Sequence, residues 1–182
     1  SQEICFVPDR DYAGFIQRHA GEVDENLGQL AVTAARPGPI VTKDGTVLGQ
    51  HSGIHRFTVG QRKGLGIAHP RPLYVLRLDL ARNAVVVGYK EDLFCDGLIA
   101  ERLNWIGARP PSFPLRSSVK IRARHPDAPA TIHQKGDLAY VLFDSPQMSV
   151  TPGQAAVFYQ GERVLGGGWI KESIRSASEC QV

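Results

Sequence analysis

Short hydrophobic runs separated by turn residues occupy the second half of the chain. Apolar and polar positions alternate within the runs, which is typical of strands that bury one face. Their number and spacing predict a closed β-barrel. The expected strands are residues 98–106, 115–125, 130–133, 138–143, 155–159 and 163–170. We expect every proline of this half to lie between the strands, because proline has no N–H group for a strand ladder.

The first half predicts a smaller unit that contains both helix and strand. Residues 9–19 carry apolar side chains at helical spacing, so a short helix is expected there. The Asp44-Gly45 pair between two strand-like runs predicts a hairpin with a type I′ turn, in which both turn residues have positive φ angles. Residues 73–80 and 84–88 form a second predicted hairpin. These elements indicate an α+β unit that ends near Asp92.

The predicted fold class is therefore mostly β (α+β), with a small α+β central domain followed by a six-stranded β-barrel. We assign residues 1–96 to the N-terminal segment and central domain, 97–175 to the barrel and 176–182 to a tail. No apolar run is long enough to cross a bilayer, and the N-terminus lacks a signal-peptide pattern, so we expect a cytoplasmic protein. Because Met148 is the only methionine, we expect the chain to be a piece of a longer protein.

The three cysteines, Cys5, Cys95 and Cys180, match no disulfide framework and no C-x-x-C metal pair, so free thiols are expected. Cys5 stands among apolar residues, where it is either a small buried hydrophobe or a nucleophile whose pKa is lowered by groups distant in sequence. The sequence leaves both interpretations open. Cys95 is expected to be a packed thiol at the junction of the two domains.

His51 and His55 stand four residues apart, the spacing of paired metal ligands on a helix. The glutamate of such sites is missing and Gly53 weakens a helix, so we favour a histidine that supports the following loop by hydrogen bonds or packing, and we expect no metal. A hydrolase that pairs Cys5 with one of these histidines is a weaker alternative, because no third orienting group is apparent.

Two groups of cations could bind phosphates. The net charge is only +3, so any polyanion site must be local. Residues 60–67 contain three glycines around Arg62 and Lys63, which form either a solvated turn or a phosphate contact. Along residues 115–125, a stripe of cations alternates with apolar positions, and either water or a polyanion would cover it. The stripe consists of Lys120, Arg122 and Arg124, with Arg116 and His125 adjoining.

Several motifs occur in an order that is specific to one family. They are residues 1–6, His51-x-Gly53, residues 57–67, residues 151–159 and Gly166-Gly167-Gly168. On these residues the chain resembles the central and C-terminal parts of the tRNA-uridine 2-sulfurtransferases, over almost its whole length. The resemblance implies that the barrel is similar to the second domain of elongation factor Tu.

The resemblance also implies a reaction. An ATP-binding pyrophosphatase domain, absent here, would adenylate the C2 oxygen of the wobble uridine, and a persulfide on Cys5 would then deliver sulfur to C2. A second cysteine in the missing N-terminal part would complete sulfur release. The partners would be tRNA and a sulfur-donor protein of a persulfide relay, with the enzyme a monomer. The residues expected to contact tRNA are Gln61, Arg62, Lys63, Lys120, Arg122 and Arg124.

An alternative from a different class remains open. The chain could be a non-enzymatic RNA-binding barrel module related to translation factors, in which Cys5 is merely structural. A persulfide on Cys5 after exposure to a sulfur donor would separate the two hypotheses.

Overall fold

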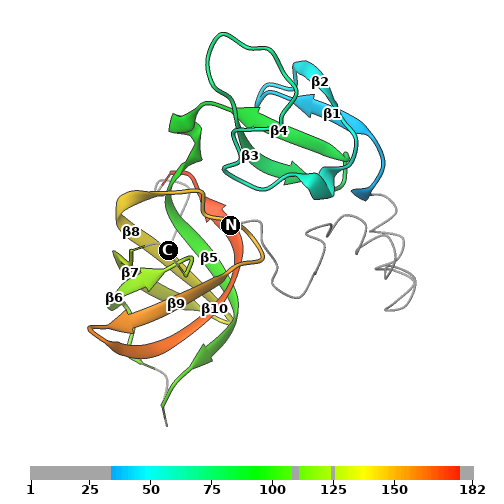
Figure 1. Ribbon diagram of the computed structural model, residues 1–182. Coiled ribbons are helices and arrows are strands. Elements are labelled where there is room, and N and C mark those ends of the chain that lie inside the picture. The colour runs from blue at the N-terminus through cyan, green and yellow to red at the C-terminus, as the bar shows by residue number, and fades with distance from the viewer. Residues whose placement is uncertain (1–33, 108–110, 124–125, 177–182) are drawn as a thin grey trace, which may run out of the picture. The chain divides into compact units, whose positions relative to one another are not determined.

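The computed structural model describes residues 34–107, 111–123 and 126–176. The chain divides into two compact units between Asp92 and Leu93 (Figure 1). The helix predicted at 9–19 lies outside the described residues, as do Cys5 and Cys180. No helix in the described ranges is long and apolar enough to span a membrane.

The first unit contains a four-stranded sheet with the order β2-β1-β4-β3. β1 pairs antiparallel with β2 and parallel with β4, while β3 and β4 pair antiparallel, so both predicted hairpins are confirmed. Apolar residues of all four strands and of the following loops form its core. The elements are β1 (Gly38–Val41), β2 (Val47–His51), β3 (Tyr74–Asp79), β4 (Ala84–Gly88), and the 3-10 helices η1 (Ile54–Arg56) and η2 (Lys90–Leu93).

The turn of the first hairpin differs from the prediction. Gly45 has a φ of 89°, but Asp44 has no positive φ, so the turn is not type I′. The Gly45 N–H donates to the Thr42 carbonyl over 3.1 Å, and the Thr42 N–H donates to the Thr46 carbonyl over 2.9 Å. A three-residue loop of this kind needs only one left-handed residue, which is the glycine. The Asp44 carboxylate accepts a hydrogen bond from the Thr46 hydroxyl and so supports the loop.

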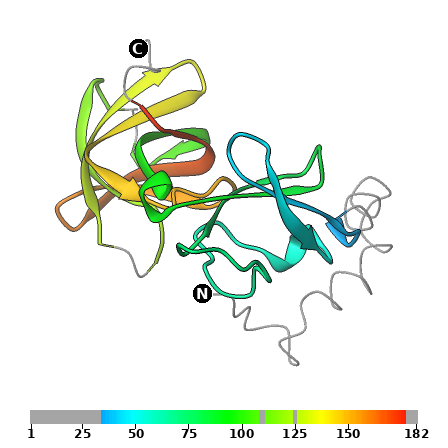
Figure 2. The same ribbon diagram turned by 90° about the horizontal axis from the view of Figure 1, so that it is seen from above.

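The second unit is a closed barrel with the strand order β10-β5-β8-β7-β6-β9, which confirms the predicted barrel and the mostly β class (Figures 1 and 2). Its core is built from inward-facing side chains of all six strands, with Phe158 fully buried at 0% exposure. The strands are β5 (Phe94–Trp105), β6 (Leu115–Lys120), β7 (Ala128–Lys135), β8 (Leu138–Met148), β9 (Ala155–Gln160) and β10 (Arg163–Ile174).

Two details of the predicted barrel are wrong. β6 ends at Lys120 instead of reaching residue 125. Pro129 and Pro146 lie inside β7 and β8, not between strands. β8 pairs with β7 only from Ala130 onward, so Pro129 has a strand partner on one side only. Pro146 lies where the pairing of β8 with β5 shifts register. A missing N–H is tolerated at such irregular positions.

The glycine run of β10 permits close contact between three strands. A Cβ atom on Gly166 would come within 2.5 Å of the Asn104 carbonyl oxygen of β5. On Gly167 it would come within 2.6 Å of the Ala156 carbonyl oxygen of β9. Side chains at these positions would therefore separate β10 from its neighbours, which explains why the run is built of glycine.

Replacing Phe158 with alanine should lower the free energy of unfolding of the barrel by about 3–5 kcal/mol, because a fully buried ring would be lost and a cavity left. Both tryptophans, Trp105 and Trp169, lie in the barrel, so tryptophan fluorescence during urea unfolding reports on this unit. The matched control is Phe94→Ala, at a residue that is 43% exposed, and its effect should be below about 1 kcal/mol. Equal losses from the two variants would contradict the assigned core.

Candidate nucleic-acid interface

The glycine-rich loop after η1 is fastened to β3 by backbone hydrogen bonds. The Gly60 N–H donates to the Val75 carbonyl over 2.8 Å, and the Val75 N–H donates to the Gln61 carbonyl over 2.9 Å. Gly60, Gly64 and Gly66 have φ angles of 87°, 77° and 67°. A side chain at any of these positions would strain the backbone, so the three glycines are required by the path of the loop.

The side chain of Gln61 braces the same loop. Its carboxamide oxygen accepts a hydrogen bond from the Thr58 N–H over 3.0 Å, and its NH₂ group donates to the Lys63 carbonyl over 2.9 Å. Both ends of the amide are thus used inside the protein. The structure places Gln61 as a support for the backbone that carries the two neighbouring cations.

Arg62 and Lys63 are exposed at the surface of this loop. Neither forms an ion pair with any residue that the structure describes. Leu65, only 8% exposed, anchors the loop in the core of the first unit. The two cations are therefore held on a fixed backbone while their charges face solvent.

A groove of about 510 Å³ runs along the second part of the loop. Two arginines and a histidine line it, and no carboxylate is among the described residues that line it. The apolar part of its wall includes Ile67, Pro70 and Pro72. The groove thus combines positive charge with a partly apolar surface.

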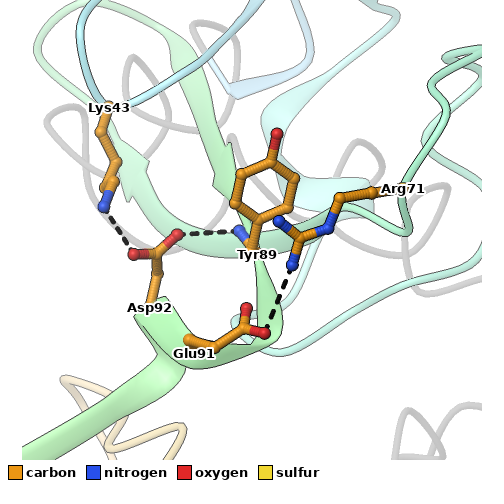
Figure 3. Close-up of polar contacts among 5 residues, drawn as sticks. All are labelled: Lys43, Arg71, Tyr89, Glu91 and Asp92. Atoms are coloured by element: carbon orange, nitrogen blue, oxygen red, sulfur yellow. Dashed lines mark hydrogen bonds and ion pairs between the residues drawn. The ribbon is translucent and has the colours of Figure 1, made fainter.

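Arg71 of the groove is held by two groups of the same unit (Figure 3). Its guanidinium lies 4.0 Å from the centroid of the Tyr89 ring, and its Nη2 donates to the Glu91 carboxylate over 3.3 Å. The two charged side chains are 59% and 73% exposed. Ion pairs this open to water contribute at most about 1 kcal/mol, so the bond to Glu91 is weak.

A second ion pair fixes the carboxylate next to Glu91 (Figure 3). Asp92 accepts a hydrogen bond from the Lys43 ammonium, and its other oxygen accepts one from the Tyr89 N–H over 2.8 Å. Asp92 therefore links the β1–β2 hairpin to the backbone of Tyr89, beneath the ring on which Arg71 stacks.

His51 supports the chain that leads into the loop, as predicted for one of the two histidines. Its Nδ1 accepts a hydrogen bond from the Gly53 N–H, so the neutral ring donates from Nε2 to the Asn83 carbonyl, 3.0 Å away. Burial lowers the pKa of this imidazole. The ring also makes an edge contact with Phe57. His55 instead contacts the Ala34 carbonyl through Nδ1. No group of three potential metal-ligating residues occurs within the described residues.

The predicted cation stripe of the barrel is not one strand face. Lys120 is the last residue of β6, Arg122 lies beyond the strand, and Arg124 is outside the described residues. Arg122 donates from Nη2 to the Met148 carbonyl over 2.9 Å, so it also serves the barrel itself. Arg116 binds Asp144 through two hydrogen bonds of 2.8 and 2.7 Å, which lowers the pKa of that carboxylate.

Cys95 is a packed thiol, as predicted, and its neighbours are residues of the barrel core. It is 5% exposed, and burial raises the pKa of the thiol. A buried thiol that resists ionisation is a poor nucleophile. Cys5, the predicted sulfur carrier, lies outside the described residues.

Sequence reasoning missed Arg71, Tyr89 and Glu91. Arg71 lies in the loop before β3, whereas Tyr89 and Glu91 follow β4, and the fold brings these two segments together. The available signal was the run His69-Pro70-Arg71-Pro72, in which two prolines fix the backbone around a cation close to the glycine-rich loop.

Comparison with known proteins divides the chain into two family domains. Residues 29–89 match a family model described as a tRNA methyl transferase PRC-barrel domain, and residues 95–170 match one described as an aminomethyltransferase beta-barrel domain. Among curated proteins, the tRNA-specific 2-thiouridylase of Geotalea uraniireducens is 51% identical over 97% of this chain and 44% of its own length. That of Symbiobacterium thermophilum is 49% identical over 96% of this chain and 42% of its own length. The chain thus spans less than half the length of these two relatives.

Protonation of His51 should destabilise the first unit. Because its folded pKa lies below the ordinary value of 6.5, the unfolded state binds the proton more readily, and the stabilisation is present above that pH and is lost as the pH falls toward the lowered pKa. Amide hydrogen exchange of β1 and β2 at pH 7.5 and 5.5 measures this loss. His51→Gln should reduce the pH dependence of amide protection in β1 and β2, whereas the exposed control His69→Gln should retain it. If the pH dependence of amide protection were the same in His51→Gln as in wild type, protonation of His51 would not be its cause.

Proposed function

Because the chain belongs to the tRNA-specific 2-thiouridylase family, we propose that it is the sulfur-carrying and tRNA-binding part of an enzyme that 2-thiolates the wobble uridine of tRNA. The observation that carries this proposal is the identity of about half of all residues with such enzymes over nearly the whole chain. The proposed partners are tRNA and a sulfur-donor protein of a persulfide relay. We propose a monomeric, cytoplasmic enzyme.

The proposed chemistry assigns Cys5 the role of sulfur carrier. The terminal sulfur of its persulfide attacks C2 of a uridine whose C2 oxygen carries AMP, and AMP leaves with that oxygen. A second cysteine then attacks the Cys5 sulfur, which forms a disulfide and leaves the terminal sulfur on C2. We propose that adenylation consumes ATP in a domain that corresponds to the part of the relatives that this chain does not match. We expect this chain alone to bind tRNA and carry sulfur without completing thiolation.

The task proposed for the two described units is to hold RNA. The wobble base must leave the anticodon stack to reach the reacting groups, so the phosphates around it need fixed contacts. Arg62 and Lys63 suit this task because they are exposed on a braced backbone and have no ion-pair partner among the described residues. Gln61 acts through them by bracing the loop. Lys120, Arg122 and Arg124 are proposed as further contacts on the barrel.

Cys5→Ser in the full-length enzyme should abolish 2-thiouridine formation while tRNA binding remains, because the persulfide has no other attachment point in the proposal. Mass spectrometry of modified nucleosides and of the protein after exposure to a sulfur donor measures both steps. The matched control is Cys95→Ser, which removes a buried thiol and should keep thiolation. Normal 2-thiouridine formation by Cys5→Ser would rule Cys5 out as carrier and favour the non-enzymatic RNA-binding alternative.

Lys63→Ala should weaken tRNA binding and lower the slope of log K against log salt by up to about one unit, because one phosphate contact is lost. Fluorescence anisotropy with labelled tRNA across a salt series measures the slope. Lys135→Ala, which removes an exposed lysine outside the proposed contacts, is the matched control. Equal slopes for wild type and Lys63→Ala would exclude Lys63 from the interface.

A further inference from the structure

The groove beside the glycine-rich loop has the charge expected of a phosphate site. Arg62 and Arg71 line it together with His69, and within the part of the chain that the structure describes no acidic residue lines it. The net charge of the whole chain is only +3, so the positive charge of the groove comes from cations that gather there and not from an excess over the whole surface. A ligand with negative charge complements the groove.

Arg71 is prepared for such a ligand. Stacking on Tyr89 at 4.0 Å holds the guanidinium plane, while the one hydrogen bond to Glu91 is long, at 3.3 Å. Arg116 in the barrel is held by more bonds, because two bonds of 2.8 and 2.7 Å to Asp144 and a further bond to the Thr131 hydroxyl engage both of its terminal nitrogens. Arg71 can therefore exchange its carboxylate partner for a phosphate more readily than Arg116 can.

The wall of the groove favours an unpaired nucleotide over a duplex. Ile67, Pro70 and Pro72 give it an apolar part next to the arginines. The bases of a duplex are stacked inside the helix and offer mainly phosphates to a protein, whereas an unpaired nucleotide offers a base face as well. Only an unpaired nucleotide would contact both the arginines and the apolar wall of the groove.

We propose that this groove binds an unpaired nucleotide of RNA, with its phosphate between Arg62 and Arg71, and that Glu91 is displaced from Arg71 when RNA binds. The inference rests on the proposed function, since it names a further contact for the same RNA. It assigns Arg71 as a binding residue, Tyr89 as a positioning residue and Glu91 as an internal competitor of the phosphate.

A double-mutant cycle tests the displacement. The probe is a fluorescein-labelled single-stranded RNA oligonucleotide bound to the 182-residue chain, measured by anisotropy at several salt concentrations. Arg71→Gln should weaken binding about 3- to 10-fold and lower the salt slope by up to about one unit. Glu91→Gln should tighten binding about 2- to 3-fold in the wild-type background and have no effect in the Arg71→Gln background.

A matched pair of controls separates displacement from general electrostatics. Arg77 and Asp79 also form an ion pair in the first unit, with side chains 54% and 14% exposed, but neither lines the groove. Arg77→Gln and Asp79→Asn should therefore change binding less than the groove variants do. Equal effects of the two pairs, or an effect of Glu91→Gln that persists without Arg71, would overturn the inference. Circular dichroism confirms that each variant is folded.

The ligand class is tested by competition. Unlabelled single-stranded RNA should displace the probe at lower concentration than duplex RNA of the same length, and an acidic peptide should not displace it. Equal competition by duplex RNA would overturn the unpaired-nucleotide assignment. If Lys63→Ala weakens tRNA binding but Arg71→Gln and Glu91→Gln do not alter it, the groove is not an RNA-binding site, while the proposed function still holds. If wild type binds neither tRNA nor the oligonucleotide at low salt, the proposed RNA-binding function itself fails.

Discussion

The candidate interface depends on the two backbone hydrogen bonds that join Gly60 and Gln61 to Val75 of β3. Val75 is fully buried, so these bonds tie the loop to the core of the first unit. The three left-handed glycines let the chain turn after this attachment and return to β3. Without the attachment, ordering Arg62 and Arg71 around one ligand would carry the entropic penalty of fixing a free loop. Because the two bonds form when the protein folds, the loop is already ordered before a ligand binds.

Charge pairing decides which cations remain available to a polyanion. Arg116 forms two hydrogen bonds to Asp144, and Arg122 donates one to the Met148 carbonyl. Arg62 has no ion-pair partner among the described residues, and Arg71 has one weak, water-exposed partner. Arg62 and Arg71 of the first unit are therefore available to a polyanion at lower energetic cost than Arg116 and Arg122 of the barrel. A count of lysines and arginines would have favoured the barrel stripe, whereas the hydrogen bonds favour Arg62 and Arg71 over Arg116 and Arg122.

The sequence predicted elements that depend on residues close together in the chain, and it missed features that depend on contacts between distant segments. Alternating apolar positions located all six barrel strands, because one buried face imposes a period of two, and turn residues between strand-like runs located both hairpins. The Asp44-Gly45 pair is compatible with more than one turn, so the turn type was wrong. The end of β6 at Lys120 and the prolines inside strands depend on where neighbouring strands pair. The stack of Arg71 on Tyr89 joins segments 18 positions apart in the numbering, and no periodicity signals it.

The proposed sulfur chemistry requires properties of the carrier cysteine that Cys95 does not have. A sulfur carrier must ionise near neutral pH and must be reached both by a donor protein and by a nucleic-acid base. Cys95 meets neither demand, because it is buried in the barrel core and burial raises the pKa of its thiol. A persulfide placed there would also add a sulfur atom to a close-packed interior, which destabilises the fold. Cys95 thus contributes through packing alone, and any persulfide on this chain has to form at a thiol outside the barrel core.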